Sequence, residues 1–234
     1  RALLVLPALA FTGLCATAQK SNAATTINAS VVTIMGTGIP DEYYVLDDNG
    51  AASGIRIRQR FQAPIPSDAG GTYTFVGGLD LNVDWHADSG ASQLTNFTYR
   101  LYYDNDPSMA YNWSSGIDVT LAGDNSYGTD ATLNGGGDEG SFAAKAPGND
   151  TMQNSWRLSQ FPFFGLNLAL PGANYGLRMD VIGGNGVVSS AQANLQVVPE
   201  PSSALLGLGV IGGMLTRRRR KSACDNRELP RIRL

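Results

Sequence analysis

The chain has 234 residues, of which 28 are glycines and only one is a histidine, and its formal net charge at neutral pH is −3. This small charge conceals an acidic body, with 17 acidic residues against seven basic ones in residues 24–198, and a basic segment that begins at residue 217. An acidic body argues against nucleic-acid binding. Both cysteines, Cys15 and Cys224, lie outside this body, which excludes a disulfide or a thiolate metal site within it.

The first segment has the residue order of a secretory signal peptide. Arg1 precedes an apolar stretch at residues 2–16, and small residues follow. Charged, apolar and small-residue regions in this order are typical of export through the Sec machinery. We therefore expect residues 1–23 to be a signal peptide with a truncated charged region and a helix, cleaved after Ala18 or alternatively after Ala23 or Ala24.

Residues 24–198 carry apolar residues at every second position, which indicates strands with one buried face. Clusters of Gly, Asn, Asp and Pro separate the runs, and no stretch has a helical period. We expect one all-β domain of eight to ten strands, an antiparallel two-sheet β-sandwich of the Ig-like or jelly-roll-like kind. The inward positions that the alternation predicts are Ile55, Ile57, Leu79, Leu81, Val83, Trp85, Phe97, Tyr99, Leu101, Tyr103, Ile117, Val119, Leu121, Tyr175, Leu177, Met179 and Val181.

The last part of this body adds turn signals. We expect a turn at Asn154, Ser155 and Trp156, a Pro-Gly turn at Pro171, and a final strand that runs to Val198. With these features the segment loosely resembles the closing hairpins of Ig-like bacterial surface domains. Such a resemblance implies a fold and no activity.

Catalytic chemistry has few candidates in this sequence. We expect His86, the single histidine, to lie in an exposed loop, and histidine-based triads and zinc sites need partners that the body lacks. Residues 24–198 contain only two glutamates, Glu42 and Glu139, so a glycosidase carboxylate pair would have to be drawn largely from the aspartates. We therefore expect no catalytic residue.

The stretch YYDNDPSMAYNW holds the best candidate for a binding site. Asp104 and Asp106 have the spacing at which two carboxylates can face one Ca²⁺, with Asn105 between them, although no EF-hand continuation follows. Tyr103 and Trp113 add rings that stack against sugars when they are exposed. We expect no obligatory cofactor, and these five residues form a candidate Ca²⁺ or glycan site. Asp80, Asn82 and Asp84 offer a second set of ligands, for which a solvated strand face is the simpler explanation.

The segment after the body combines three features. The triplet Pro199, Glu200 and Pro201 follows Val198, and an apolar, glycine-rich run occupies residues 204–215. Twelve residues are short for a bilayer, which needs about 20. A cluster of positive charge that favours the cytoplasmic side follows: Arg217, Arg218, Arg219, Arg220 and Lys221.

In this order the segment closely resembles the PEP-CTERM sorting signal of Gram-negative bacteria. The resemblance implies an exosortase as partner, transient insertion of a short helix in the inner membrane, and delivery to the cell surface or the exterior. We therefore divide the chain into a signal peptide (1–23), a β-sandwich (24–198), a sorting signal (199–221) and a basic tail (222–234).

Together these features predict an exported, exosortase-sorted protein of the cell surface or of an exopolysaccharide or biofilm matrix, without catalytic activity. The alternative is an extracellular polysaccharide-active hydrolase that uses a carboxylate pair.

Overall fold

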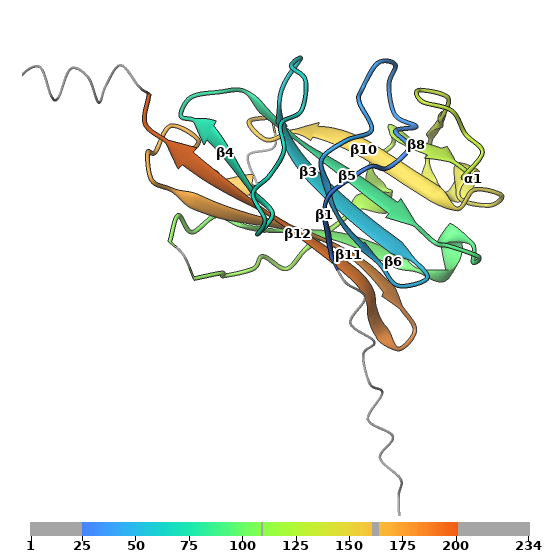
Figure 1. Cartoon of the computed structure of the whole chain (residues 1–234). Helices are drawn as coiled ribbons and strands as arrows, with labels where there is room; N and C mark the ends of the chain where they lie inside the picture. The colour runs from blue at the N-terminus through green and yellow to red at the C-terminus, as the bar shows by residue number, and fades with distance from the viewer. Residues whose placement is uncertain (1–24, 109, 161–163, 201–234) are drawn as a thin grey trace, which may run out of the picture.

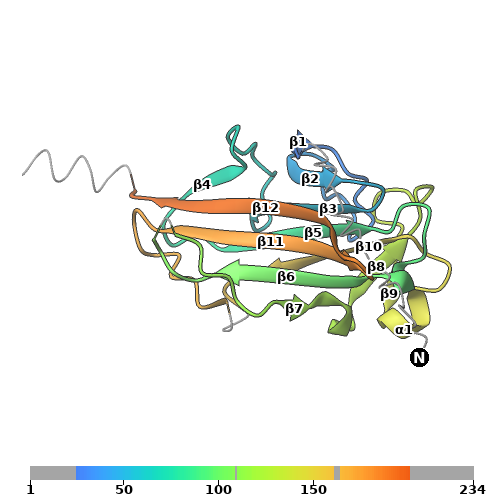
Figure 2. The same ribbon diagram turned by 90° about the horizontal axis from the view of Figure 1, so that it is seen from below.

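The computed structural model describes residues 25–108, 110–160 and 164–200, which form two packed β-sheets (Figure 1). The seven-stranded sheet has the order β1-β2-β3-β5-β10-β8-β9, and the five-stranded sheet has the order β4-β12-β11-β6-β7. Figure 2 shows the five strands of the second sheet side by side. The strands of the first sheet are β1 (Thr26–Ala29), β2 (Tyr44–Asp48), β3 (Ala52–Gln59), β5 (Leu81–Asp88), β10 (Thr151–Arg157), β8 (Asn125–Gly128) and β9 (Asp138–Gly140). Those of the second are β4 (Thr72–Val76), β12 (Gly186–Val198), β11 (Asn174–Gly183), β6 (Thr98–Asp104) and β7 (Ile117–Asp118).

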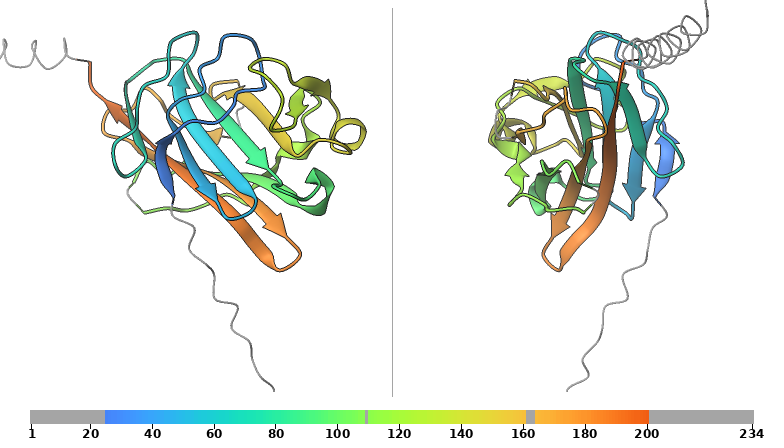
Figure 3. Two further views of the ribbon diagram at one scale, coloured as in Figure 1. Left: turned by 45° about the vertical axis from the view of Figure 1, so that its right-hand side comes forward. Right: turned by 90° about the vertical axis from the view of Figure 1, so that its left-hand side faces the viewer.

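The predicted sandwich is confirmed, with two corrections to its details. The described residues contain twelve strands rather than eight to ten, and β4 pairs with β12 in parallel, from Thr72 opposite Asn194 to Val76 opposite Val198. Short helices interrupt the loops: η1 (Leu94–Asn96), η2 (Val119–Leu121) and α1 (Phe142–Lys145). The hairpin of β11 and β12 is the longest pair and projects beyond its neighbours (Figure 3).

The core lies between the two sheets and consists largely of the predicted alternating residues. Trp85, on β5, is completely buried, and its ring meets that of Trp156 edge to face, with 5.9 Å between centroids. Leu121 is a wrong prediction, because η2 breaks the alternation after Val119 and leaves Leu121 83% exposed. The turn expected at residues 154–156 is also wrong: those residues belong to β10, whereas the turn at Pro171 is present.

A polar cluster is buried on the outer face of the seven-stranded sheet. The sequence predicted that Asn82 and Asp84 face solvent, but both are buried, because residues 30–43 cross over this face. Arg56 donates through Nη1 to the carbonyls of Pro40 and Glu42, 2.8 and 2.7 Å away, and so ties the crossing segment to the sheet. The alternation correctly predicts that these side chains point away from the opposite sheet, but it does not predict which segment covers them.

Within these described ranges, no helix has the length and apolar character that crossing a membrane requires. The predicted signal helix in residues 1–23 and the short membrane helix at residues 204–215 both lie outside the described residues.

Asp84 provides the sharpest test of the buried cluster. Asp84→Asn removes the charge that faces two guanidinium groups, and we expect it to lower the free energy of unfolding by about 3–5 kcal/mol. Asp138→Asn is the matched control, because Asp138 is 69% exposed and pairs with Lys145 at the surface; we expect a loss below about 1 kcal/mol. Urea denaturation followed by tryptophan fluorescence measures both, and equal effects would contradict this account.

Candidate functional site

The structure separates the residues of the predicted Ca²⁺ or glycan site. Asp104 ends β6 and is buried, and its Oδ1 accepts the backbone N–H of Asp106 at 3.0 Å. Asp106 is exposed, and its Oδ1 accepts the N–H of Ser108 at 2.9 Å. One oxygen of each carboxylate is therefore used to hold the turn. Asp104 Oδ2 is buried and has no hydrogen-bond partner among the described residues.

The neighbouring residues of this turn point in different directions. Tyr103 packs against the core, where its ring meets Phe164 edge to face at 5.3 Å between centroids. Asn105 lies against Gly165, where a Cβ would come within 3.1 Å of Asn105 Nδ2. In the part of the chain that the structure describes, no three His, Cys, Asp or Glu residues are grouped so that they could hold a metal ion.

Trp113 belongs instead to a stack on the outer face of the five-stranded sheet. Its ring lies nearly parallel to that of Tyr111, with 5.1 Å between centroids, and both rings rest on Gly176, where a Cβ would clash. The guanidinium carbon of Arg178 lies 4.9 Å from the Trp113 ring centroid and 4.3 Å from that of Tyr102. These contacts occupy Trp113, whereas Tyr111, at 48% exposure, keeps accessible surface.

The stack continues into a row of amide side chains on β12. Tyr111 donates its hydroxyl to Asn194 Oδ1 at 2.8 Å, and Gln192 Nε2 donates to the same oxygen at 3.1 Å. Alternation along β12 places Ser190 on this face as well, and its N–H donates to Asp47 Oδ2 at 2.7 Å. Aromatic, amide and hydroxyl groups therefore form one continuous surface.

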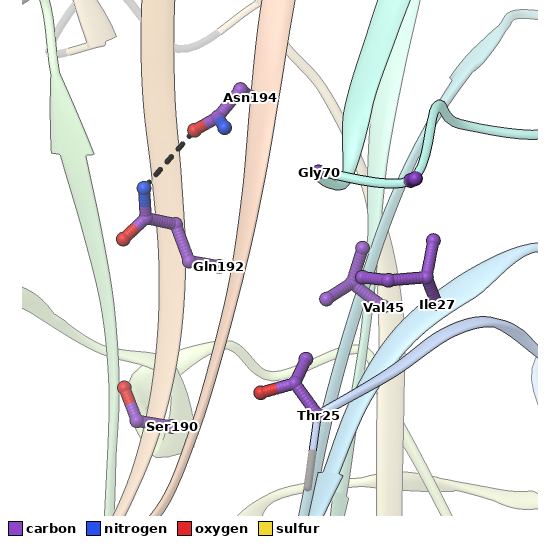
Figure 4. A pocket seen from close by; sticks show the side chains of 8 residues that line it. Thr25, Ile27, Val45, Gly70, Ser190, Gln192 and Asn194 are labelled. Atoms are coloured by element: carbon purple, nitrogen blue, oxygen red, sulfur yellow. Dashed lines mark hydrogen bonds between the residues drawn. The ribbon is translucent and has the colours of Figure 1, made fainter.

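A groove of about 450 Å³ borders this row, where the middle of β12 passes beside β1 and β2. Figure 4 shows Ser190, Gln192 and Asn194 on one side of it, facing Ile27 and Val45 across the opening. None of its lining residues is charged. We call it the β12 groove, and its lining residues are Thr25, Ile27, Val45, Ala69, Gly70, Ser190, Gln192 and Asn194.

The sequence predicted only part of this surface. Trp113 was recognised from its polar surroundings, but Arg178 and Asn194 were not, although the alternation that buries Leu177 and Leu195 turns them outward. The β12 groove depends on the approach of β12 to residues 25–27 and 69–70, and nothing in the local sequence signals that contact.

His86 lies in a different environment from the predicted exposed loop, and that prediction is wrong. It sits in the middle of β5 opposite Gln153, and its residue exposure is 5%. Gln153 Nε2 lies 2.9 Å from Nδ1 of the ring, while the same amide binds the backbone of Val32 and Ile34. The amide thus donates to an unprotonated Nδ1, and burial lowers the pKa of His86 to about 4.

This burial predicts a pH dependence of stability. The folded-state pKa of His86 lies below the ordinary value of 6.5, so the unfolded chain takes up the proton first as the pH falls. The buried, uncharged His86 therefore contributes its full share of the free energy of unfolding above about pH 6.5. This share is lost as the pH falls, and by pH 4 we expect the free energy of unfolding to be lower by about 3 kcal/mol. Unfolding free energies of the wild type and of His86→Gln, measured from pH 7 to 4, should differ by this changing amount. Parallel curves would contradict it.

The predicted sorting residues begin inside the fold. Val198 is the last residue of β12 and pairs with Val76 of β4, and Pro199 and Glu200 follow as exposed residues. Pro201, the apolar run and the cluster from Arg217 to Lys221 lie outside the described residues.

Comparison with known proteins agrees with this C-terminal assignment. Residues 197–221 match the family model of the PEP-CTERM protein-sorting motif. No curated protein matches the chain. The motif implies processing by an exosortase and export toward the cell surface. With this motif, which begins in the last two residues of β12, the chain is a PEP-CTERM domain-containing protein.

Proposed function

We propose that this chain is a non-catalytic protein of the cell surface or extracellular matrix that binds exopolysaccharide through the outer face of its five-stranded sheet. Its route outward uses Sec export, a transient inner-membrane intermediate and exosortase processing. The observation that carries the binding proposal is the continuity of Tyr111, Asn194 and Gln192 with the uncharged β12 groove.

The chemistry of this face suits a neutral sugar. Sugar rings present C–H faces to aromatic rings, and their hydroxyls bind amide and hydroxyl side chains. Tyr111 supplies the exposed ring at the edge, while Asn194, Gln192 and Ser190 supply polar groups along the groove. Because no charged side chain lines the groove, a ligand bound there gains nothing from carrying charge.

Three of the carboxylates that a hydrolase could use are engaged in ion pairs or hydrogen bonds. Asp84 faces two arginines, Asp80 pairs with Arg157 at 2.7 Å, and Asp180 accepts hydrogen bonds from Arg178 and Ser190. The hydrogen bond from the Arg157 guanidinium holds the pKa of the Asp80 carboxyl below its ordinary value, whereas a general acid requires a raised pKa. This arrangement supports binding without hydrolysis.

Asn194 tests the binding proposal. Asn194→Ala removes the acceptor shared by Tyr111 and Gln192, and we expect it to weaken binding of a neutral exopolysaccharide by about tenfold. Gln196→Ala is the matched control, because Gln196 is exposed on the same face of β12 and contacts Thr74 outside the groove. Isothermal titration measures both.

Two further measurements accompany this titration. We expect EDTA to leave the affinity unchanged; loss of binding would instead assign Asp104 Oδ2 to a cation. We also expect no release of reducing sugar during prolonged incubation, and steady release would favour the hydrolase alternative. An affinity unchanged in Asn194→Ala would contradict the proposed face.

The sorting proposal has its own test. Replacing Arg217, Arg218, Arg219 and Arg220 by glutamine removes four of the five positive charges that hold the end of the apolar run on the cytoplasmic side, so we expect unprocessed protein to accumulate. Replacing the three arginines of residues 222–234 is the matched control and should leave processing unchanged. Intact-mass measurement of the surface form in the native host reads out both, and an identical processed mass in the first variant would refute the proposal.

A further inference from the structure

One part of the outer face of the seven-stranded sheet gathers more arginines than carboxylates. Asp84 Oδ2 accepts from Arg56 Nη2 and from Arg58 Nε, both at 2.6 Å, so one carboxylate faces two guanidinium groups. Near it, Asp80 is approached by Arg157 at 2.7 Å and by Arg60 at 3.7 Å. Four arginines meet two aspartates here, in a body whose net charge is negative.

A pocket of about 490 Å³ opens beside this cluster. The crossing segment that Arg56 holds through the Pro40 carbonyl and the residues that follow β3 line this pocket together with Arg58. We call it the Arg58 pocket, and its lining residues are Gly38, Ile39, Pro40, Arg58, Phe61, Gln62 and Ala63.

Arg58 brings unused hydrogen-bonding capacity to this pocket. The residue is 8% exposed, and it donates through Nε to Asp84 and through Nη2 to Ser155 at 3.3 Å. Its Nη1 group has no hydrogen-bond partner among the described residues. A guanidinium group fixed by two neighbours is well suited to bind an anionic oxygen, because little conformational entropy remains to be lost.

Phe61 gives the pocket an exposed aromatic rim. Its side chain is 82% exposed although it is large and apolar, and its backbone adopts the left-handed conformation, with φ of 60°. The guanidinium carbon of Arg60 lies 4.4 Å from the ring centroid. A left-handed backbone is uncommon at a bulky residue, and such strained conformations cluster at active sites and ligand-binding segments.

From these four observations we propose that the Arg58 pocket binds a sugar acid. The ligand's carboxylate binds Arg58 Nη1, the apolar face of its ring packs on Phe61, and its hydroxyls bind the Gln62 amide. This second site goes beyond the function proposed above, because it lies on the other sheet and selects a charged ligand where the β12 groove selects a neutral one.

The test compares trigalacturonate with its neutral, carboxyl-reduced counterpart by isothermal titration of the full-length chain. We expect the acid to bind at least about tenfold more tightly, and raising the salt concentration to weaken this binding. Equal affinity for the two trisaccharides would overturn the proposal, as would binding that salt does not change. Inorganic phosphate provides a third arm, and competition by phosphate as strong as by the trisaccharide would overturn the assignment to a sugar ring.

Variants locate the site. Arg58→Met should lower the affinity for trigalacturonate by at least about tenfold, and Asn194→Ala should leave it unchanged. Since Arg58 is part of a buried cluster, its variant can fail to fold, so Phe61→Gly and Gln62→Ala carry the test independently. Glycine accepts the left-handed backbone at residue 61, and we expect about a fivefold loss for each variant. Leu133→Gly, which removes another side chain of 81% exposure, is the control. Unchanged affinity in both pocket variants would overturn the proposal.

Discussion

The arrangement of the seven-stranded sheet depends on how the buried charge of Arg56 is compensated. This side chain is completely buried on the outer face of a sheet, where an uncompensated charge would be very costly. Asp84 neutralises it, the carbonyls of Pro40 and Glu42 occupy its third nitrogen, and the Tyr44 ring lies 4.3 Å from its guanidinium carbon. The two carbonyl contacts need residues 30–43 in place over the sheet, whereas Asp84 and Tyr44 belong to strands of the sheet itself. The cluster therefore determines which of the two outer faces is covered and which stays open.

That asymmetry separates the two proposed binding surfaces. The covered face holds the Arg58 pocket at the edge of the crossing segment, with the charge of the cluster beneath it, and a smaller pocket of about 180 Å³ beside His86 and Asp88. The open face presents alternate residues of β11 and β12 directly, and their charges are compensated on the strand itself, as for Arg178 and Asp180. A protein with an acidic body can thus present a cationic pocket on one sheet and an uncharged groove on the other.

The sequence predicted the sheets better than the surfaces, for a physical reason. Alternation reports whether a side chain points toward the opposite sheet, so the burial of Ile55, Trp85 and Met179 was predictable from neighbouring residues alone. Whether an outward side chain meets water depends on segments far away in sequence. His86 and Asp84 therefore looked exposed, although residues 30–43 bury them. The same limit applies to the β12 groove, which forms between segments more than 100 residues apart.

Folding and sorting share residues at the end of β12. The matched sorting motif begins at Val197, which is 1% exposed and whose N–H and C=O bind Ala173 and Gly172. Pro199 cannot donate a hydrogen bond and is the first residue beyond the strand, so the Pro-Glu-Pro triplet starts where the sheet ends. Only five residues, 199–203, separate Val198 from the apolar run that begins at Ala204. An extended chain of five residues spans at most about 18 Å, so the run begins close to the end of the sheet. An enzyme that acts at this triplet must therefore work against the folded end of the sandwich, or else draw Val197 out of it at the expense of its burial and its hydrogen bonds.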